Sequence, residues 1–276
     1  MVSIRKELAE YGLVPRKKWG QHFLIDRNIL NKVIRTAQID ENDVVLEVGP
    51  GLGEMTVELA RKAKKVITVE IDQKLVELLK KKLIGYSNLE VVKSDILKVD
   101  FNELFNQEEI PVKVVANLPY QISTPLLFRF VESRKVFSTL TLMLQKEVAE
   151  RMIAPPGGKD YGPLSIFVQM VGNLFIPFSV KPTAFYPSPR VESAVIHMAW
   201  KEKPMVGRRE EEWFRKIVKG CFSYRRKTLI NALKHSDLPL PSDLEPRMKR
   251  IGIDPQRRPE TLSIQEFAHL AEILKS

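Results

Sequence analysis

The chain has 276 residues, a mass of 31.7 kDa and a formal net charge of +10, because 44 Lys and Arg outnumber 34 Asp and Glu. Apolar residues make up 44% and charged residues 28%, which is ordinary globular usage and excludes a wholly disordered chain or a collagen-like fibre. The single cysteine, Cys221, excludes an intramolecular disulfide framework and a cysteine-based zinc site, so we expect a cytoplasmic protein without a metal.

The N-terminal stretch carries Glu7 and Glu10 where a signal peptide needs an unbroken apolar run. No stretch of the sequence approaches the roughly 18 apolar residues of a membrane span. We therefore expect neither an export signal nor a membrane anchor.

Short apolar runs rich in β-branched residues alternate with helical patterns from Asp43 to about residue 145. This alternation predicts βαβ units and a parallel sheet, because parallel strands need a crossover connection. The predicted strands are 44–48, 66–69, 89–92, 112–116 and 139–144, and the predicted helices between them are 54–63, 73–83 and 124–133.

Two further runs, 174–180 and 191–200, predict strands joined by the proline-rich segment 185–189. Prolines suit the edge of a sheet, so we expect these strands to form an antiparallel hairpin there. Beyond about Glu210 only helical periods occur.

The composition changes at Pro204 and Gly207. We therefore expect two domains. Residues 1–200 form a Rossmann-like α/β domain, whose basic segment 1–26 we expect to border a ligand site, and residues 201–276 form a small all-helical domain.

Basic residues are most concentrated in the C-terminal part: positions 201–276 hold 17 basic and 11 acidic residues. The clusters are Arg208-Arg209, Arg225-Arg226-Lys227, Arg247 with Lys249-Arg250, Arg257-Arg258 and, near the N-terminus, Arg16-Lys17-Lys18 beside Trp19. Such groups suit phosphate neutralisation in RNA, although charge alone is equally typical of a solvated basic surface.

A glycine-rich turn follows the first predicted strand directly, in the segment Glu47-Val48-Gly49-Pro50-Gly51-Leu52-Gly53. Glycines at such a turn let a ligand approach the backbone closely. Glu70 ends the next strand, where a carboxylate can accept both hydroxyls of an adenosine ribose. The third glycine arrives one residue early for a dinucleotide fingerprint, so NAD is disfavoured. The pattern resembles the first motif of S-adenosylmethionine methyltransferases, in which Asp95 would accept the adenine amino group; the alternative is a tight turn with surface acids.

The segment Asn117-Leu118-Pro119-Tyr120 follows the fourth predicted strand, beside the expected cofactor site. An exocyclic adenine amine is a poor nucleophile, because its lone pair is delocalised into the ring. The Asn117 carboxamide oxygen and a main-chain carbonyl, that of Leu118, can accept its two hydrogens and turn the lone pair toward a methyl donor. Tyr120 can stack on the base. The alternative is an ordinary Asn-Pro turn whose Tyr fills a crevice.

Five segments together resemble the KsgA-type family of ribosomal RNA adenine N6,N6-dimethyltransferases. They are Gly20–Leu24, Glu47–Gly53, Asn117–Pro125, Phe185–Ser193 and Arg225–Leu229. The resemblance implies a Rossmann-like methyltransferase sheet with a small C-terminal helical domain, and S-adenosylmethionine as cofactor. It also implies, as substrate, two adjacent adenosines in a hairpin loop near the 3′ end of small-subunit rRNA in the pre-30S particle.

The same resemblance implies the roles of individual residues. The cofactor would be bordered by His22, Leu24, Gly49, Gly51, Glu70, Asp95 and Asn117. The target base would be held and activated by Asn117, Leu118, Pro119, Tyr120 and Phe185, with Phe185 on the side of the base opposite Tyr120. Many family members carry Asn at the position of His22, which leaves open a side-chain contact, a backbone contact or a capped turn before Asp26.

Other functions remain open at this point. The closest alternative is a large-subunit rRNA adenine N6-methyltransferase; a protein glutamine or DNA adenine methyltransferase shares a similar tetrapeptide. A ribosome-assembly or transcription factor that keeps the fold without turnover is a non-enzymatic alternative. We expect a monomer, because nothing in the sequence demands a dimer.

Overall fold

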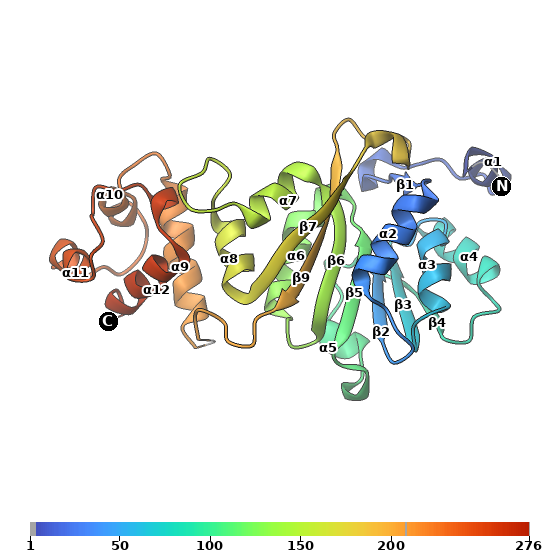
Figure 1. The fold of residues 1–276 in the computed structure, drawn as a ribbon, viewed down its shortest axis with the longest axis horizontal. Coiled ribbons are helices and arrows are strands. Elements are labelled where there is room, and N and C mark those ends of the chain that lie inside the picture. Colours follow the sequence, from blue (N-terminus) through green and yellow to red (C-terminus); the bar gives the residue numbers. More distant parts are fainter. Residues whose placement is uncertain (1–3, 208, 276) are drawn as a thin grey trace. The chain divides into compact units, whose positions relative to one another are not determined.

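The computed structural model describes residues 4–207 and 209–275, and Arg208 of the predicted basic clusters lies outside these ranges. The chain divides into two compact units. Unit 1 holds the residues up to Ala149 together with Leu174–Trp200, and unit 2 holds Glu150–Asn173 together with the residues from Lys201 onward. Figure 1 labels the elements of both units.

Unit 1 is built on a seven-stranded sheet with the order β4-β3-β2-β5-β6-β9-β7. Its strands are β2 (Val44–Val48), β3 (Lys65–Glu70), β4 (Leu89–Lys93), β5 (Val112–Asn117), β6 (Phe137–Gln145), β7 (Gly172–Val180) and β9 (Ser193–Trp200). The first five pair in parallel, which confirms the predicted βαβ rhythm, and β9 runs antiparallel to β6. A separate two-stranded sheet pairs β1 (Phe23–Leu24) with β8 (Phe185–Tyr186).

Helices connect these strands. Those of unit 1 are α1 (Ile4–Glu10), α2 (Arg27–Ala37), α3 (Glu54–Ala60), α4 (Gln73–Lys82), α5 (Phe101–Leu104) and α6 (Ser123–Glu132), with short 3₁₀ turns at Lys17–Trp19, Gln107–Glu109, Tyr120–Ile122 and Pro182–Ala184. Helix α7 (Lys146–Ile153) follows β6. At the start of α6 the Ser123 hydroxyl donates to the carbonyls of Pro119 and Tyr120, and the cap position falls on Ile122.

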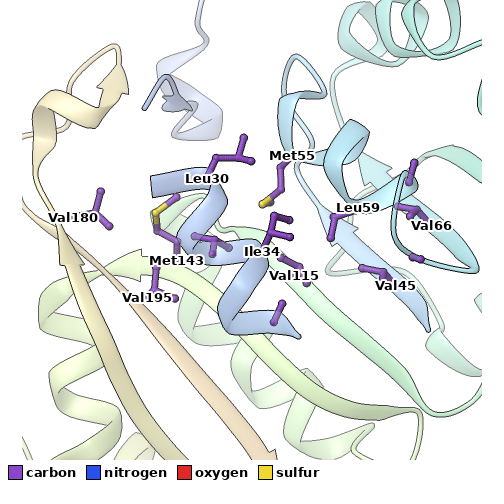
Figure 2. Packing of buried hydrophobic residues seen from close by; sticks show 14 of the residues in the cluster. Leu30, Ile34, Val45, Met55, Leu59, Val66, Val115, Met143, Val180 and Val195 are labelled. Carbon is purple, nitrogen blue, oxygen red and sulfur yellow. The ribbon is translucent and has the colours of Figure 1, made fainter. Parts of the chain in front are cut away.

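Helix α2 shows how the core of unit 1 is made. The carboxylate of Asp26 caps its N-terminus by accepting the amides of Asn28 (2.8 Å) and Ile29 (3.2 Å). Its apolar residues recur at helical spacing, so Leu30 and Ile34 face the sheet (Figure 2). Met55, Leu59, Val115 and Met143 join them in one buried cluster. The central strands are thereby held rigid beneath the turns that follow them.

The other face of the sheet is covered by α6, which lies behind the strands where α2 lies in front (Figure 1). Phe101 and Phe130 meet Phe137 of β6 nearly edge-on, with ring centroids 5.0 and 5.2 Å apart. Strands β3 and β5 lie on opposite sides of β2. The connections diverge there, and such a switch point leaves a crevice at the carboxyl ends of the strands.

Unit 2 is helical, as predicted for the C-terminal part. Its elements are α8 (Pro163–Val171), α9 (Glu211–Ser223), α10 (Leu229–Lys234), α11 (Leu244–Arg250), a 3₁₀ turn at Pro259–Thr261 and α12 (Ile264–Ile273). Ser263 and Glu266 form a capping box at the start of α12. Cys221 is fully buried in this core, as expected for a small apolar residue.

The extent of unit 2 differs from the expectation in one respect. One of its borders coincides with the expected boundary at residue 201, but α8 and its flanking segment, which the sequence places in the first domain, belong to unit 2. The reason is packing: Phe167 of α8 lies against Phe214 of α9, and the amide of Lys201 donates to the Val171 carbonyl (2.8 Å). In the described part of the chain, no helix combines the length and apolar character needed to cross a bilayer.

Candidate functional site

A cavity opens at the carboxyl ends of β2, β3, β4 and β5. Its walls come from the segment 18–23, the glycine turn, the ends of β3 and β4, and the segment 117–122. This is the crevice at the switch point of the sheet. Nine of the eleven residues predicted for the site lie in its lining: His22, Gly49, Gly51, Glu70, Asp95, Asn117, Leu118, Pro119 and Tyr120.

The glycine turn forms one wall of this cavity. Gly49, Gly51 and Gly53 all have positive φ angles (67°, 59° and 84°), the left-handed region that side chains disfavour. A Cβ atom added at Gly51 would lie 2.9 Å from Cδ1 of Phe23. Only glycine therefore keeps the backbone of the turn open to a ligand.

Glu70 lies at the carboxyl end of β3 and is almost fully buried. Its Oε1 accepts the amides of Ile71 (2.9 Å) and Asp72 (2.8 Å), which fixes the carboxyl group at the cavity. Burial raises the pKa of Glu70 to about 7, against the lowering effect of these amide bonds. Asp95 lies in the loop after β4, where its Oδ1 accepts the amide of Leu97 (3.0 Å).

Asn117 is the last residue of β5. Its Nδ2 donates to the main-chain carbonyl of His22 (2.9 Å), and this bond sets the orientation of the carboxamide. The amide oxygen, Oδ1, is thereby kept as a hydrogen-bond acceptor in the cavity. The next residue, Leu118, is anchored by its amide, which donates to the Met143 carbonyl (2.9 Å).

Tyr120 is held at both ends. Its hydroxyl lies 2.6 Å from Oγ of Ser193, on β9, and its ring stacks on the His22 imidazole with centroids 5.5 Å apart. Burial raises the pKa of the Tyr120 hydroxyl. The tyrosine is therefore neutral at physiological pH, and it lines the cavity.

His22 makes three contacts within the protein. Its backbone carbonyl holds Asn117, while its Nδ1 donates to the carbonyl of Pro187 (2.6 Å) and its ring meets Tyr120. The imidazole therefore joins the segment 20–24 to the proline-rich segment 185–189.

Leu24 and Phe185 are not in the lining of the main cavity. They face each other in the β1–β8 pair, and Phe185 is only 3% exposed within the apolar cluster of unit 1. Leu24 lines a second, smaller cavity instead. The expected position of Phe185 opposite Tyr120 is not the observed one, because the pairing with β1 turns its ring into the core.

Sequence reasoning missed Arg129, on the otherwise apolar helix α6. Its guanidinium donates to the carbonyls of Ile96 (2.5 Å) and Val99, and lies over the Phe101 ring (4.8 Å to the centroid). These bonds hold the loop that carries Asp95. The one available signal was a lone cation in an apolar helical stretch.

We expect Arg129→Met to destabilise unit 1 by about 2–3 kcal/mol, because the two carbonyls lose charged donors while the apolar stem is kept. Cofactor affinity should fall as well, since the Asp95 loop is no longer held. Thermal denaturation and a titration with S-adenosylhomocysteine measure both effects. Arg61→Met is the matched control, because the Arg61 side chain is exposed and pairs with Glu58 (2.8 Å). Wild-type stability and affinity in Arg129→Met would contradict this role.

The N-terminal segment was predicted only as a basic border of the site. The structure shows how it is held: Arg16 and Lys18 lie over the Trp19 ring, at 4.5 and 4.7 Å from its centroid. Arg16 also pairs with the buried Asp72 (3.4 Å), the residue whose amide binds Glu70. Lys18 and Trp19 line the cavity.

Among the described residues, no group of three or more His, Cys, Asp or Glu side chains is arranged to hold a metal ion. The acceptors that line the cavity are carboxylate, carboxamide and main-chain oxygens around an open glycine turn. They fit a polar ligand with hydroxyl and amino hydrogens to donate.

Comparison with known proteins agrees with this geometry. A family model described as Ribosomal RNA adenine dimethylase matches residues 13–276. Proteins named Ribosomal RNA small subunit methyltransferase A from Bacillus cereus and Bacillus mycoides are each 43% identical over 276 residues, covering 98% of this chain and 94% of theirs.

Two solved structures share the fold. A dimethyladenosine transferase from Plasmodium falciparum has a TM-score of 0.77 and 32% identity, over 90% of this chain and 96% of that one. The 23S rRNA methyltransferase ErmE has a TM-score of 0.69 and 26% identity, over 92% of this chain and 100% of that one. With a cavity built from the glycine turn, Glu70, Asp95 and Asn117, and a family match over nearly its whole length, the chain belongs to the ribosomal RNA adenine dimethylase family.

Proposed function

We propose that this enzyme transfers methyl groups from S-adenosylmethionine to N6 of two adjacent adenosines, in a hairpin loop near the 3′ end of small-subunit rRNA. It would act as a monomer on the pre-30S particle in the cytoplasm. The observation that carries the proposal is the Asn117 carboxamide, whose Nδ2 is committed to the His22 carbonyl and whose Oδ1 is left as an acceptor in the cavity.

The cavity fits the family's cofactor, S-adenosylmethionine. The fixed Glu70 carboxyl suits the two ribose hydroxyls, and Asp95 suits the adenine amino group. Gly51 lines the cavity, and the absence of a Cβ lets its backbone pack closely against the Phe23 ring. When bound, S-adenosylmethionine supplies an electrophilic methyl group on a sulfonium centre.

Asn117 and Leu118 activate the target amine in this proposal. The Asn117 Oδ1 and the Leu118 carbonyl accept its two hydrogens, so that the nitrogen lone pair points at the methyl group. The amine loses a proton after it has gained the methyl group, when it is already acidic, so no strong general base is required. Orientation of two bound partners can contribute roughly 7–11 kcal/mol to such a transfer.

Tyr120 and Pro119 would hold the extruded base. Base stacking on an aromatic ring is worth about 1–3 kcal/mol, comparable with the few kcal/mol spent in extruding a nucleotide. The Ser193 bond keeps the Tyr120 ring from rotating away. Phe185 would reach the base only if β8 rearranged, so we assign the stacking to Tyr120 alone.

A large-subunit substrate is the nearest alternative. Relatives named for the small subunit are 43% identical to this chain, whereas the 23S rRNA methyltransferase ErmE is 26% identical. This difference supports the small subunit. A factor without turnover is disfavoured, because Gly49, Gly51, Glu70, Asp95 and Asn117 are all present in the cavity.

Unit 2 would contribute to rRNA binding through Arg225, Arg226 and Lys227. Arg226 and Lys227 are exposed, whereas Arg225 also donates to the carbonyl of Gly158 (3.2 Å). We expect replacement of all three by Gln to weaken rRNA binding and to reduce its logarithmic salt slope by roughly 2, at about 0.7–0.9 for each lost phosphate contact. Filter binding across a salt series measures the slope.

The matched control replaces Lys62 and Lys64 by Gln. Both are exposed and precede β3, at the end of the sheet away from the cavity. An unchanged salt slope of rRNA binding in the Arg225, Arg226 and Lys227 variant would show that this cluster does not contact the rRNA phosphates. S-adenosylhomocysteine affinity should remain at the wild-type value in both variants.

The test of the whole proposal uses immature small subunits, S-adenosylmethionine and the purified protein. Mass spectrometry of the digested rRNA should show two adjacent N6,N6-dimethyladenosines near the 3′ end. Modification of large-subunit rRNA in a parallel reaction, or the absence of any methylated adenosine, would contradict it.

A further inference from the structure

The segment between α9 and α10 presents an aromatic ring to the solvent beside the basic cluster of unit 2. Tyr224 directly precedes Arg225-Arg226-Lys227 and is 38% exposed. Within the described part of unit 2, it is the one aromatic among the exposed large apolar residues. Phosphate contacts made by the cluster do not require such a ring, so the tyrosine calls for an explanation of its own.

Two neighbours hold the Tyr224 ring in place. The amide of Lys227 donates to the Tyr224 carbonyl (2.8 Å), and this turn brings the Lys227 Nζ over the ring, 5.8 Å from its centroid. The imidazole of His235, which directly follows α10, lies tilted against the same ring, with centroids 5.4 Å apart. Because the ring is already ordered, a ligand that stacks on it need not supply the free energy of ordering it.

His235 is itself fixed by hydrogen bonds at both ring nitrogens. Its Nδ1 lies 2.7 Å from the Asn231 carbonyl, and its Nε2 lies 2.8 Å from the Lys227 Nζ. A carbonyl only accepts and an ammonium group only donates, so Nδ1 is the donor and Nε2 is the acceptor. The imidazole therefore joins α10 to Lys227 and keeps the ammonium group beside the Tyr224 ring.

The sequence around the ring is strongly basic. Arg226 and Lys227 are exposed, and no acidic residue occurs between Glu212 and Asp237. Such a segment favours a polyanionic partner. An exposed aromatic ring among these cations adds a surface on which a nucleic-acid base can stack.

We propose that Tyr224 is a stacking platform for one unpaired base of the substrate RNA, next to phosphates bound by Arg226 and Lys227. This inference rests on the proposed function. Bases inside an RNA helix are already stacked on their neighbours, whereas an unpaired base can turn out and stack on an aromatic side chain. One nucleotide can reach both the ring and the ammonium group, because a single ribose joins its base to its phosphate. This base would differ from the target adenosine, which is assigned to Tyr120 of unit 1.

Stacking and phosphate contacts respond differently to salt. A phosphate contact with single-stranded or duplex nucleic acid releases counterions, so its loss lowers the logarithmic salt slope by roughly 0.7–0.9. A stacked base releases no counterions, so loss of the ring should lower the affinity by the same factor at every salt concentration. The effects of Tyr224 and Lys227 can therefore be separated although the two side chains are in contact.

Filter binding of immature small subunits across a salt series tests the platform. In Tyr224→Leu, which removes the ring and keeps an apolar side chain, the affinity should fall roughly 5- to 150-fold with an unchanged salt slope. Tyr224→Phe keeps the ring and should bind within about twofold of the wild type. Thermal denaturation and S-adenosylhomocysteine affinity should stay at the wild-type values, which shows that both units of the variants are folded.

Phe175→Leu is the matched control for the loss of an exposed ring. Phe175 is 54% exposed, but it lies on β7 in unit 1, against His197. Its affinity for the immature subunits and its salt slope should both match the wild type.

A double-mutant cycle tests the role of His235. His235→Ala should lower the affinity less than Tyr224→Leu does, because the ring remains but is no longer held. In the Tyr224→Leu background, His235→Ala should have no further effect, since there is no ring to hold. Equal losses in both backgrounds would contradict this positioning role.

Wild-type affinity for the immature subunits in Tyr224→Leu would overturn the proposed platform. A lower salt slope in Tyr224→Leu would also overturn it, because the loss would then belong to phosphate contacts. Either result leaves the proposed function intact, since the wild-type protein still binds and methylates the particle. Failure of the wild-type protein to bind immature small subunits would instead contradict the proposed function itself.

Discussion

Asn117→Ala should reduce methyl transfer to rRNA by roughly 10²–10³-fold, the effect of removing one well-placed polar group from an active site. The loss should appear in the transfer step, because the Asn117 Oδ1 is kept as an acceptor while its Nδ2 is bound to the His22 carbonyl. Affinity for S-adenosylhomocysteine should fall much less, since Glu70 and the glycine turn remain. Single-turnover methylation and a binding titration separate the two effects.

Asn28→Ala is the control for this experiment, because Asn28 is an exposed residue at the start of α2, away from the cavity. Its turnover should match the wild type. Near-normal single-turnover methylation by Asn117→Ala would show that the carboxamide does not take part in methyl transfer. An equal fall in binding and transfer would make Asn117 a cofactor-binding residue only.

Gly51→Ala should lower cofactor affinity by roughly 10²-fold or more. The added Cβ would lie 2.9 Å from the Phe23 ring, and the φ angle of 59° disfavours any side chain. The strain costs about 1–2 kcal/mol and the crowding about 1–3 kcal/mol, in the wall that must contact the ligand. Titration with S-adenosylhomocysteine measures the affinity, and thermal denaturation shows how far the strain lowers the stability of the folded protein.

Gly85→Ala is the matched control for the glycine turn. A Cβ at Gly85 would meet no atom within 4 Å, and its φ angle is not in the left-handed region. Affinity and stability should both stay near the wild-type values. Wild-type cofactor affinity in Gly51→Ala would show that the turn does not contact the ligand.

The parallel strands and the glycine turn could be predicted from sequence because their signals are local. Runs such as Val44–Val48 are apolar at every position except Glu47, as is typical of strands buried on both faces, and β2 is buried at every position. The position of the glycine turn could be predicted as well, because its glycines stand between such a run and a helical pattern. Glu70 and Asn117 then follow from the rule that ligands bind at the carboxyl ends of parallel strands.

The features that the sequence did not predict depend on distant contacts. Phe185 lies on a two-residue strand, and only its pairing with Leu24 decides which way the ring points. Arg129 acts through carbonyls about 30 residues earlier in the chain, which no local pattern reveals. Helix α8 belongs to unit 2 because of the Phe167 and Phe214 contact, although it lies between two strands of the sheet.

The bond between Tyr120 and Ser193 has a consequence for the order in which the site matures during synthesis. The two residues are 73 positions apart in the chain, and Ser193 lies on β9, which pairs with β6. At about 5–20 residues per second, a nascent chain completes the segments up to Tyr120 roughly 4–15 s before Ser193 is added. The glycine turn and the strand ends that line the cavity can therefore assemble on the translating ribosome while the Tyr120 ring is still unanchored.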